Sequence, residues 1–246
     1  AANVRYLTGF TGEGLLVVGQ DTALVSTDGR YKVEASQMAA GAEAVFHEGG
    51  HLAGAYDHLV LLQLDSAAFE AEAVTYSGYQ TLTEKLDGLE LRPVKRWVED
   101  QRLIKAEAEV AAIREAAAKV DRALARFLTQ LEPGRTEREM MLHLECELAA
   151  EDTEPAFPVI VASGESASRP HAVPGSRRLA EGEMLKIDVG GVYDGYRSDL
   201  TRTYFVGDAD AKFAEIYRLV LQAQEAALAV AGPGVPCREV DSAARQ

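Results

Sequence analysis

Short apolar runs alternate with polar, helix-favouring stretches along the N-terminal part of the chain. Residues 15–18 and 23–25 are apolar and flank a Gly-Gln-Asp segment, a pattern that predicts a β-hairpin. A helix is expected from about Asp28. Further apolar runs at 44–46 and 58–64 predict more strands between Ala- and Glu-rich helical stretches. This rhythm is typical of an α/β domain.

Longer amphipathic stretches follow. Between residues 106 and 131, apolar positions recur at helical spacing among Ala, Glu and Lys, which predicts one long helix that ends at Pro133-Gly134. A second helix is expected through Met140, Leu144 and Leu148.

The change of pattern near Trp97 predicts two domains, residues 1–97 and residues 98–246. Of the 246 residues, 47% are apolar, enough to bury the cores of two ordinary domains. In the second domain, residues 133–139 and 233–239 share the pattern P-G-x-x-x-R-E. This match is compatible with an internal duplication and also with a chance likeness between two helical hairpins.

Charge and cysteine content narrow the classes of function. The 39 acidic and 25 basic residues give a net charge of −14, which disfavours nucleic acids and acidic membrane surfaces as partners. Two cysteines are too few for a disulfide framework, and no apolar run is long enough to span a bilayer, so we expect a cytoplasmic protein. The chain starts without Met and stops within a helical pattern, so we expect it to be truncated at both ends.

Two aspartates flank the most informative turn. The arms around Asp194-Gly195 are rich in β-forming residues and predict an antiparallel hairpin. A two-residue turn pairs Asp188 with Thr201, whereas a loop over residues 192–195 pairs Asp188 directly with Asp199. Either register places both carboxylates on one face, and only a three-residue loop would separate them.

Carboxylates so arranged repel each other unless a cation or a proton lies between them. One interpretation is that both are solvated on an exposed strand face. The metal-site interpretation is favoured because the arm before Asp188 is apolar at alternate positions, and because Gly190-Gly191 lets another group approach the backbone. Oxygen-rich sites suit Mn²⁺, and Co²⁺ or Zn²⁺ if an imidazole joins.

Four blocks occur in order: residues 157–164, Pro170-His171, residues 188–190 and residues 195–203. Together they resemble the creatinase/prolidase/methionine aminopeptidase family, which has a pita-bread catalytic fold. Residues 3–10 and 27–31 are similar to the small N-terminal domain of prolidases and Xaa-Pro aminopeptidases. The resemblance implies an α/β N-terminal domain followed by the first half of an α+β pita-bread domain.

The resemblance also implies roles for single residues. Asp188 matches the family's first metal-binding aspartate, and Asp199 matches the second, which bridges two divalent ions. His171 matches a histidine that contacts the substrate or intermediate, and Phe157 falls where the family places a residue lining the substrate pocket. The family's other ligands, a histidine and two glutamates, are C-terminal to the matched blocks, so we expect residues 1–246 to be inactive.

The function implied is hydrolysis of Xaa-Pro bonds, by an Xaa-Pro dipeptidase (prolidase) with two metal ions, Mn²⁺ being preferred over Co²⁺ or Zn²⁺. A homodimer is expected, and the substrate is a peptide with proline at the second position. The close alternative is an Xaa-Pro aminopeptidase. A metal-free creatinase-like hydrolase and a non-catalytic binding module share the fold, but the presence of Asp188 and Asp199 argues against both.

Residues 47–51 spell H-E-x-x-H, the motif of helical zinc sites. Two consecutive glycines in this segment disfavour a helix by about 2 kcal/mol relative to alanine. A polar loop after the strand at residues 44–46 is therefore predicted, with no metal site.

Overall fold

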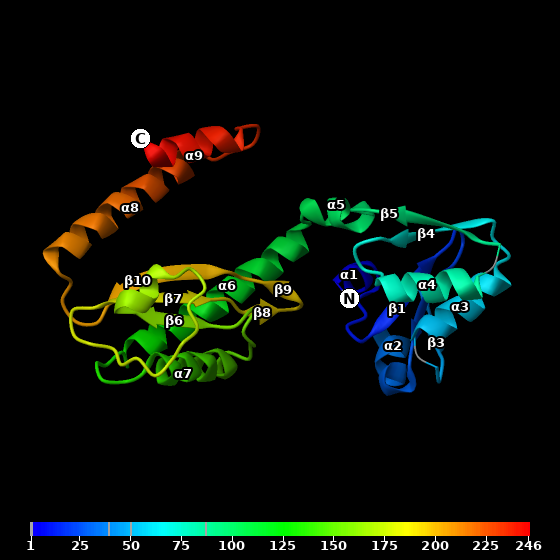
Figure 1. Ribbon diagram of the computed structural model, residues 1–246, viewed down its shortest axis with the longest axis horizontal. Helices are drawn as coiled ribbons and strands as arrows, with labels where there is room; N and C mark the ends of the chain where they lie inside the picture. The colour runs from blue at the N-terminus through cyan, green and yellow to red at the C-terminus, as the bar shows by residue number, and fades with distance from the viewer. Residues whose placement is uncertain (1, 39, 50, 87) are drawn as a thin grey trace. The chain divides into compact units, whose positions relative to one another are not determined.

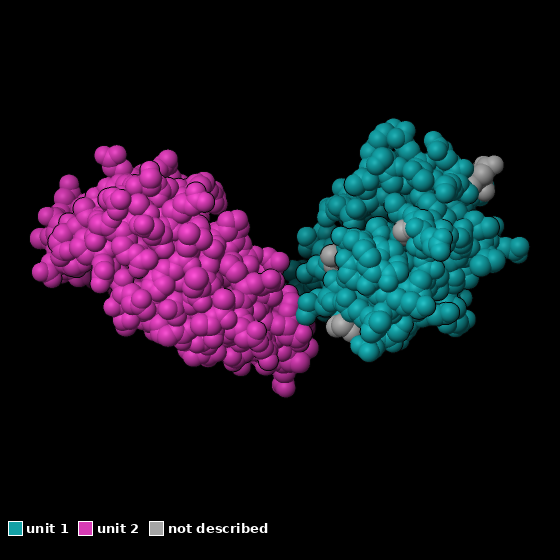
Figure 2. Space-filling view, turned by 90° about the horizontal axis from the view of Figure 1, so that it is seen from below, with its two compact units in different colours: residues 1–105 teal, residues 106–246 magenta. Residues whose placement is uncertain are grey.

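The computed structural model describes residues 2–38, 40–49, 51–86 and 88–246. It divides into two compact units, Ala1–Lys105 and Ala106–Gln246 (Figure 2). The division assigns the segment after Trp97 to unit 1, whereas the sequence pattern places the boundary at Trp97. Contacts of Asn3 account for this assignment: its amide nitrogen donates to Glu99 at 2.6 Å, and its amide oxygen accepts from Arg102 at 2.8 Å.

Unit 1 is an α/β assembly (Figure 1). In chain order it contains α1 (Ala2–Thr8), β1 (Gly14–Val18), β2 (Ala23–Thr27), the 3-10 turn η1 (Gly29–Tyr31), α2 (Lys32–Met38), β3 (Glu43–Phe46), α3 (His51–Leu61), β4 (Ser66–Glu70), α4 (Tyr76–Lys85), β5 (Glu90–Val94) and α5 (Trp97–Leu103). β1 and β2 form the predicted antiparallel hairpin, and β3 adds parallel to β2. β4 and β5 form a separate parallel pair.

One predicted strand of unit 1 is wrong. Residues 58–61 are the last turn of α3, and the next strand begins only at Ser66. Leu52, Tyr56 and Leu59 recur at helical spacing and pack in one apolar cluster with residues of α4. A short apolar run fits a strand and a buried helix equally well, and here tertiary packing selects the helix.

Unit 2 is built on a small antiparallel sheet. Its elements are α6 (Glu107–Leu128), α7 (Glu137–Ala150), β6 (Ile160–Ser163), the 3-10 turn η2 (Gly164–Ser168), β7 (Met184–Val189), β8 (Val192–Tyr193), β9 (Tyr196–Arg197), β10 (Leu200–Phe205), α8 (Ala211–Val230) and α9 (Cys237–Arg245). The strand order is β10-β7-β6, and β8 pairs with β9 in a short hairpin. No helix of the described residues is long and apolar enough to cross a membrane.

The two predicted amphipathic helices, α6 and α7, cover one face of this sheet. The helices and strands share one core, whose fully or almost fully buried members include Val120, Leu124, Phe127, Met140, Leu144, Leu148, Leu185, Ile187 and Val189. Burial alternates along β7, so the other face of the strand carries Lys186 and Asp188. Thr136 caps the N-terminus of α7 in a reciprocal box with Glu139, which fixes where this helix begins.

The repeated P-G-x-x-x-R-E pattern forms the same local structure twice. Gly134 between α6 and α7 has a φ of 89°, and Gly234 between α8 and α9 has a φ of 81°. Both glycines therefore adopt, in the turn between two helices, the left-handed conformation that glycine takes at low cost. The two helix pairs differ in burial. Helices α6 and α7 contribute residues to the core, whereas no described residue of α8 or α9 is buried.

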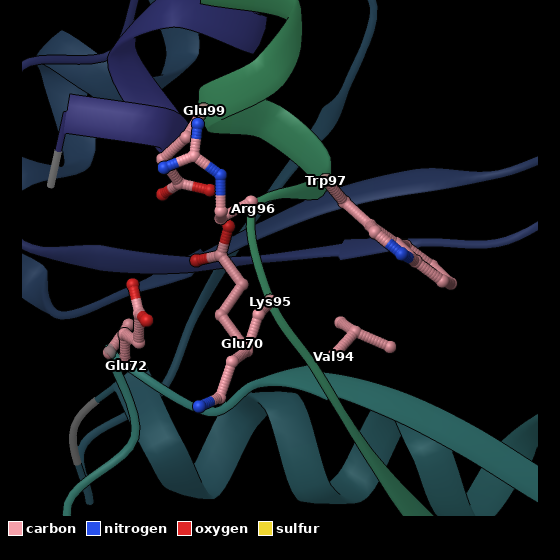
Figure 3. Close-up of a pocket in the computed structure, with 8 residues that line it drawn as sticks. Glu70, Glu72, Val94, Lys95, Arg96, Trp97 and Glu99 are labelled. Atoms are coloured by element: carbon pink, nitrogen blue, oxygen red, sulfur yellow. The ribbon is translucent and has the colours of Figure 1, made fainter.

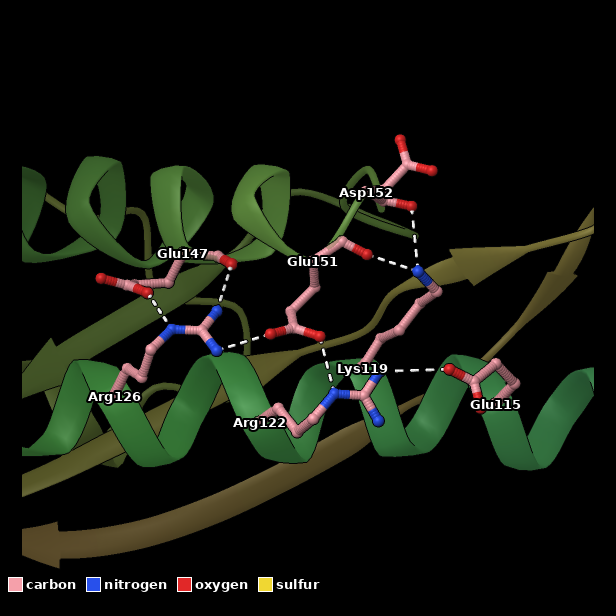
Figure 4. Close-up of polar contacts among 7 residues, drawn as sticks. All are labelled: Glu115, Lys119, Arg122, Arg126, Glu147, Glu151 and Asp152. Carbon is pink, nitrogen blue, oxygen red and sulfur yellow. Dashed lines mark hydrogen bonds and ion pairs between the residues drawn. The ribbon is translucent and has the colours of Figure 1, made fainter.

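Charged side chains join α6 to the C-terminal end of α7 (Figure 4). Arg126 contacts Glu147 at 2.6 Å and Glu151 at 2.5 Å, and Arg122 contacts the second oxygen of Glu151 at 2.6 Å. The buried ammonium of Lys119 donates to the main-chain carbonyl of Glu151, so it satisfies an acceptor that the helix end leaves free.

We expect Glu151→Gln to lower the free energy of unfolding at about pH 7, and the loss to shrink toward about pH 3. The hydrogen bonds from Arg122 and then Arg126 lower the pKa of Glu151. The folded carboxylate thus releases its proton at a lower pH than the unfolded one. Its contribution is complete above the unfolded pKa of about 4.3 and is lost as the pH falls through the folded pKa.

Urea denaturation of both proteins at the two pH values measures this difference. Glu145→Gln, on the same helix, is the control, because the ion pairs that the structure describes for Arg122 and Arg126 involve other glutamates. An equal loss of stability at both pH values would show that the ion pairs are not its source.

Candidate functional site

The hairpin predicted around Asp194-Gly195 forms with a two-residue turn. β8 and β9 pair up to Tyr193 and Tyr196, which leaves only Asp194 and Gly195 between the strands. Their φ angles of 46° and 74° are those of a type I′ turn, for which Asp-Gly is a favoured sequence. The alternative loop over residues 192–195 is not formed.

This turn fixes the register of the two aspartates. Asp188 pairs with Thr201, whose hydroxyl donates to the Asp188 carboxylate at 2.9 Å. The same register, continued past Leu200, places Asp199 opposite Gly190. Opposed residues of an antiparallel pair share a face, so Asp188 and Asp199 lie on the sheet face opposite the helices. Asp188 is half-buried and Asp199 is exposed.

The segment that carries His171 lies over the same face as Asp188. The neighbouring Ala172 is buried in a cluster with Ile160 and Ala162 of β6. Ile160 is the register partner of Asp188. The packing of Ala172 therefore holds the main chain of His171 against the carboxylate-bearing face, although His171 itself is exposed.

Lys186 provides a second attachment for this segment. It lies two residues before Asp188 on the same face of β7, and its ammonium donates to the carbonyls of Arg169 and, at 3.2 Å, Pro170. Lys186 is not among the site residues predicted from the sequence. The period of two along the strand could have placed it beside Asp188, but the carbonyls that it binds are visible only in the folded chain.

Phe157 lies against the glycine between the two aspartates. A Cβ atom added to Gly190 would be 2.8 Å from the Phe157 ring and 2.1 Å from the carbonyl oxygen of Ser198. The guanidinium of Arg197 donates to the carbonyl of Ala156, which orients the segment that carries the ring. The structure thus brings Phe157 and the hairpin together, as it does the hairpin and the segment of His171.

Glu137 is a buried polar residue outside the set of site residues predicted from the sequence. Its side chain is almost completely enclosed, and it accepts hydrogen bonds from Ser163 and Gly175. A glutamate in the first turn of a helix is usually exposed to solvent, where it interacts favourably with the helix dipole. The sequence position of Glu137 therefore predicts an exposed side chain and gives no sign of its burial.

The H-E-x-x-H segment does not form a helical metal site. His47 lies in the predicted loop after β3, where its Nδ1 accepts from the Gly49 amide at 2.9 Å and its Nε2 lies 3.2 Å from Asp57. His51 begins α3, and Gly50 lies outside the described residues. Within the described ranges, no group of three or more His, Cys, Asp or Glu residues is placed to hold a metal ion.

A cavity of about 100 Å³ in unit 1 contains none of the predicted site residues (Figure 3). Its lining includes Trp97 and the carboxylates of Glu70 and Glu99. These two carboxylates both accept from the amide of Asn3 at 2.6 Å. The polar wall of the cavity therefore joins α1, β4 and α5.

Family models match both units of the chain. The Creatinase/Prolidase N-terminal domain matches residues 1–104, and Metallopeptidase family M24 matches residues 111–246. The chain belongs to metallopeptidase family M24. This membership confirms the family resemblance and the fold class predicted from the sequence, and it implies divalent metal ions.

Solved structures and a curated relative agree with this family. The X-Pro aminopeptidase of Thermotoga maritima shares 30% identity at a TM-score of 0.92, and the chain covers 70% of it. The Xaa-Pro dipeptidase of Bacillus anthracis shares 34% identity at a TM-score of 0.92, with 69% covered. The Xaa-Pro dipeptidase of Pyrococcus horikoshii is 31% identical, with 68% covered, and each match takes in 99% of this M24 chain.

Proposed function

We propose that this M24 chain forms part of a peptidase that hydrolyses Xaa-Pro bonds, as an Xaa-Pro dipeptidase. The observation that supports the proposal is the common sheet face of Asp188, Asp199 and the segment of His171. The names of the P. horikoshii and B. anthracis relatives supply the substrate class. An Xaa-Pro aminopeptidase is the alternative, because the T. maritima relative carries that name.

Asp188 and Asp199 fit a divalent metal as part of its ligand set. Their carboxylates lie on one face, and the hydroxyl of Thr201 orients the first of them at 2.9 Å. Carboxylate oxygens suit Mn²⁺, which we propose as the metal, with Co²⁺ or Zn²⁺ as alternatives. Divalent ions, when bound, polarise a peptide carbonyl and activate water near neutral pH.

The other two residues act on the substrate. His171 is exposed on a segment held at Ala172 and Pro170, so its imidazole can hydrogen-bond the substrate or move a proton at the scissile bond. Phe157 offers an aromatic wall beside Gly190, suited to the apolar ring of a proline residue. Rigid placement of both groups lowers the entropy cost of reaching the reactive geometry.

In the complete, metal-loaded enzyme, we expect His171→Ala to keep its metal content and to lose about 10²- to 10⁴-fold in kcat, as for removal of a general acid or base. Hydrolysis of an Xaa-Pro dipeptide and of an Xaa-Pro-Yaa tripeptide, together with metal analysis, measures this. His51→Ala, in unit 1, is the control for loss of an imidazole.

Preference for the dipeptide supports the dipeptidase, and preference for the tripeptide supports the aminopeptidase. Full activity of His171→Ala would remove the proposed role of the imidazole. Absence of hydrolysis of both substrates by the unsubstituted, metal-loaded enzyme would contradict the proposed function as a whole.

A further inference from the structure

Glu137, at the N-terminal end of α7, is 2% exposed and holds both of its carboxylate oxygens in hydrogen bonds. One oxygen accepts from the main-chain amide of Ser163 at 2.8 Å and from its hydroxyl at 3.2 Å. The other oxygen accepts from the main-chain amide of Gly175 at 3.2 Å. An ionised carboxylate only accepts hydrogen bonds, so every contact of this group has the right polarity.

These two partners are the ends of one loop. Ser163 is the last residue of β6, and Gly175 lies beyond His171 in the connection toward β7. The loop between them carries His171 at its exposed part, with Ala172 packed on the sheet. A single buried side chain therefore ties together the two points at which the loop leaves and rejoins the body of unit 2.

A neighbouring ion pair also holds Ser163 in place. Arg177 donates to the Ser163 hydroxyl at 2.8 Å and forms an ion pair with Glu183 at 2.5 Å. Ser163 thus lies between the carboxylate of Glu137 and the guanidinium of Arg177. Because Glu137 and Ser163 are buried, the charge-assisted hydrogen bonds between them are costly to lose.

We propose that Glu137 is a positioning residue for His171: by joining Ser163 to Gly175 it fixes the loop that presents the imidazole to the substrate. This inference rests on the proposed function for the role of His171. Glu137 itself touches no substrate, because the body of unit 2 encloses it.

Glu137→Gln tests the link between Ser163 and Gly175 with little change in the shape of the side chain. The amide oxygen of Gln can keep the contact with Ser163, but its NH₂ group then faces the N–H of Gly175, and two donors cannot bond. Glu139→Gln is the matched control, because Glu139 lies on the same helical turn and a glutamine preserves its capping contact with Thr136.

Hydrogen exchange on the complete enzyme gives the structural result without any assay of activity. We expect Glu137→Gln to speed amide exchange about tenfold or more across residues 164–175, with α6 and α7 unchanged. Glu139→Gln should leave the loop unchanged. Exchange in the loop of Glu137→Gln that equals the unsubstituted protein would overturn the proposal.

Kinetics of the metal-loaded enzyme separate positioning from general stability. We expect Glu137→Gln to lower kcat about 10- to 100-fold with little change in KM. If Glu137 acts through His171, the double variant with His171→Ala should be no slower than His171→Ala alone. Additive losses would show that Glu137 acts elsewhere, and full activity of His171→Ala would instead refute the proposed function of the imidazole.

Glu137→Asp covers the case in which Glu137→Gln does not fold, since it keeps the charge at the helix start but is one methylene shorter. It cannot reach both ends of the loop, so the same loop-specific rise in exchange is expected. A folded Glu137→Asp protein with normal loop exchange and normal kcat would also overturn the proposal.

Discussion

Asp199→Asn should reduce peptidase activity of the complete enzyme by more than about 100-fold and lower its content of bound metal. The substitution removes the negative charge and replaces one oxygen donor by a nitrogen donor that cannot bind a cation. It leaves the backbone and the apolar side of the hairpin unchanged. Metal analysis after dialysis, together with hydrolysis of an Xaa-Pro dipeptide, measures both effects.

Asp194→Asn is the matched control for Asp199→Asn. It removes a carboxylate from the same hairpin, and Asn-Gly is as favourable as Asp-Gly in a type I′ turn. We expect this variant to keep its metal and its activity. Full activity of Asp199→Asn would contradict the assignment of this residue as a metal ligand.

Gly190→Ala should destabilise unit 2 by about 1–3 kcal/mol, the usual cost of forcing a methyl group into a packed position. The added Cβ would lie 2.1 Å from the main-chain oxygen of Ser198 and 3.0 Å from the Cβ of Ala156. The hairpin strands would have to separate beside Asp188, so metal binding should weaken as well. Urea denaturation and metal titration measure the two consequences.

Gly232→Ala provides the comparison for Gly190→Ala, because a Cβ at position 232 meets no atom within 4 Å. Unchanged or slightly raised stability is expected there, since alanine restricts the unfolded chain. If the two variants were equally stable, the close packing at Gly190 would not constrain the site.

Much of the hairpin could be predicted because its information is local. Asp-Gly predicts a hairpin turn, and both loops that the sequence left open place the two carboxylates on one face, although only the structure shows that Thr201 opposes Asp188. The alternation of apolar residues along β7 then identifies the face on which the carboxylates lie. By contrast, the run at residues 58–64 carries no local signal that separates a strand from a helix, and that prediction failed.

The attachments of the His171 loop could not be predicted for a different reason. Glu137 and Lys186 bind main-chain groups that are remote in sequence, at Ser163 and Pro170 respectively. Any backbone amide or carbonyl can be such a partner, so the residue types in the sequence do not indicate which main-chain group a side chain will bind. Only the folded chain shows which of many polar side chains hold a functional segment.

The strands of the hairpin also impose an even-number rule on insertions between Asp188 and Asp199. Because successive side chains of a strand alternate between faces, one residue added within a strand would turn the positions beyond it to the wrong side, unless a bulge absorbed it. Two added residues would restore the alternation. Insertions within the strands should therefore be tolerated in steps of two, because an odd insertion would turn residues out of the core that buries Ile187 and Val189, whereas the turn can lengthen by one residue without changing either face.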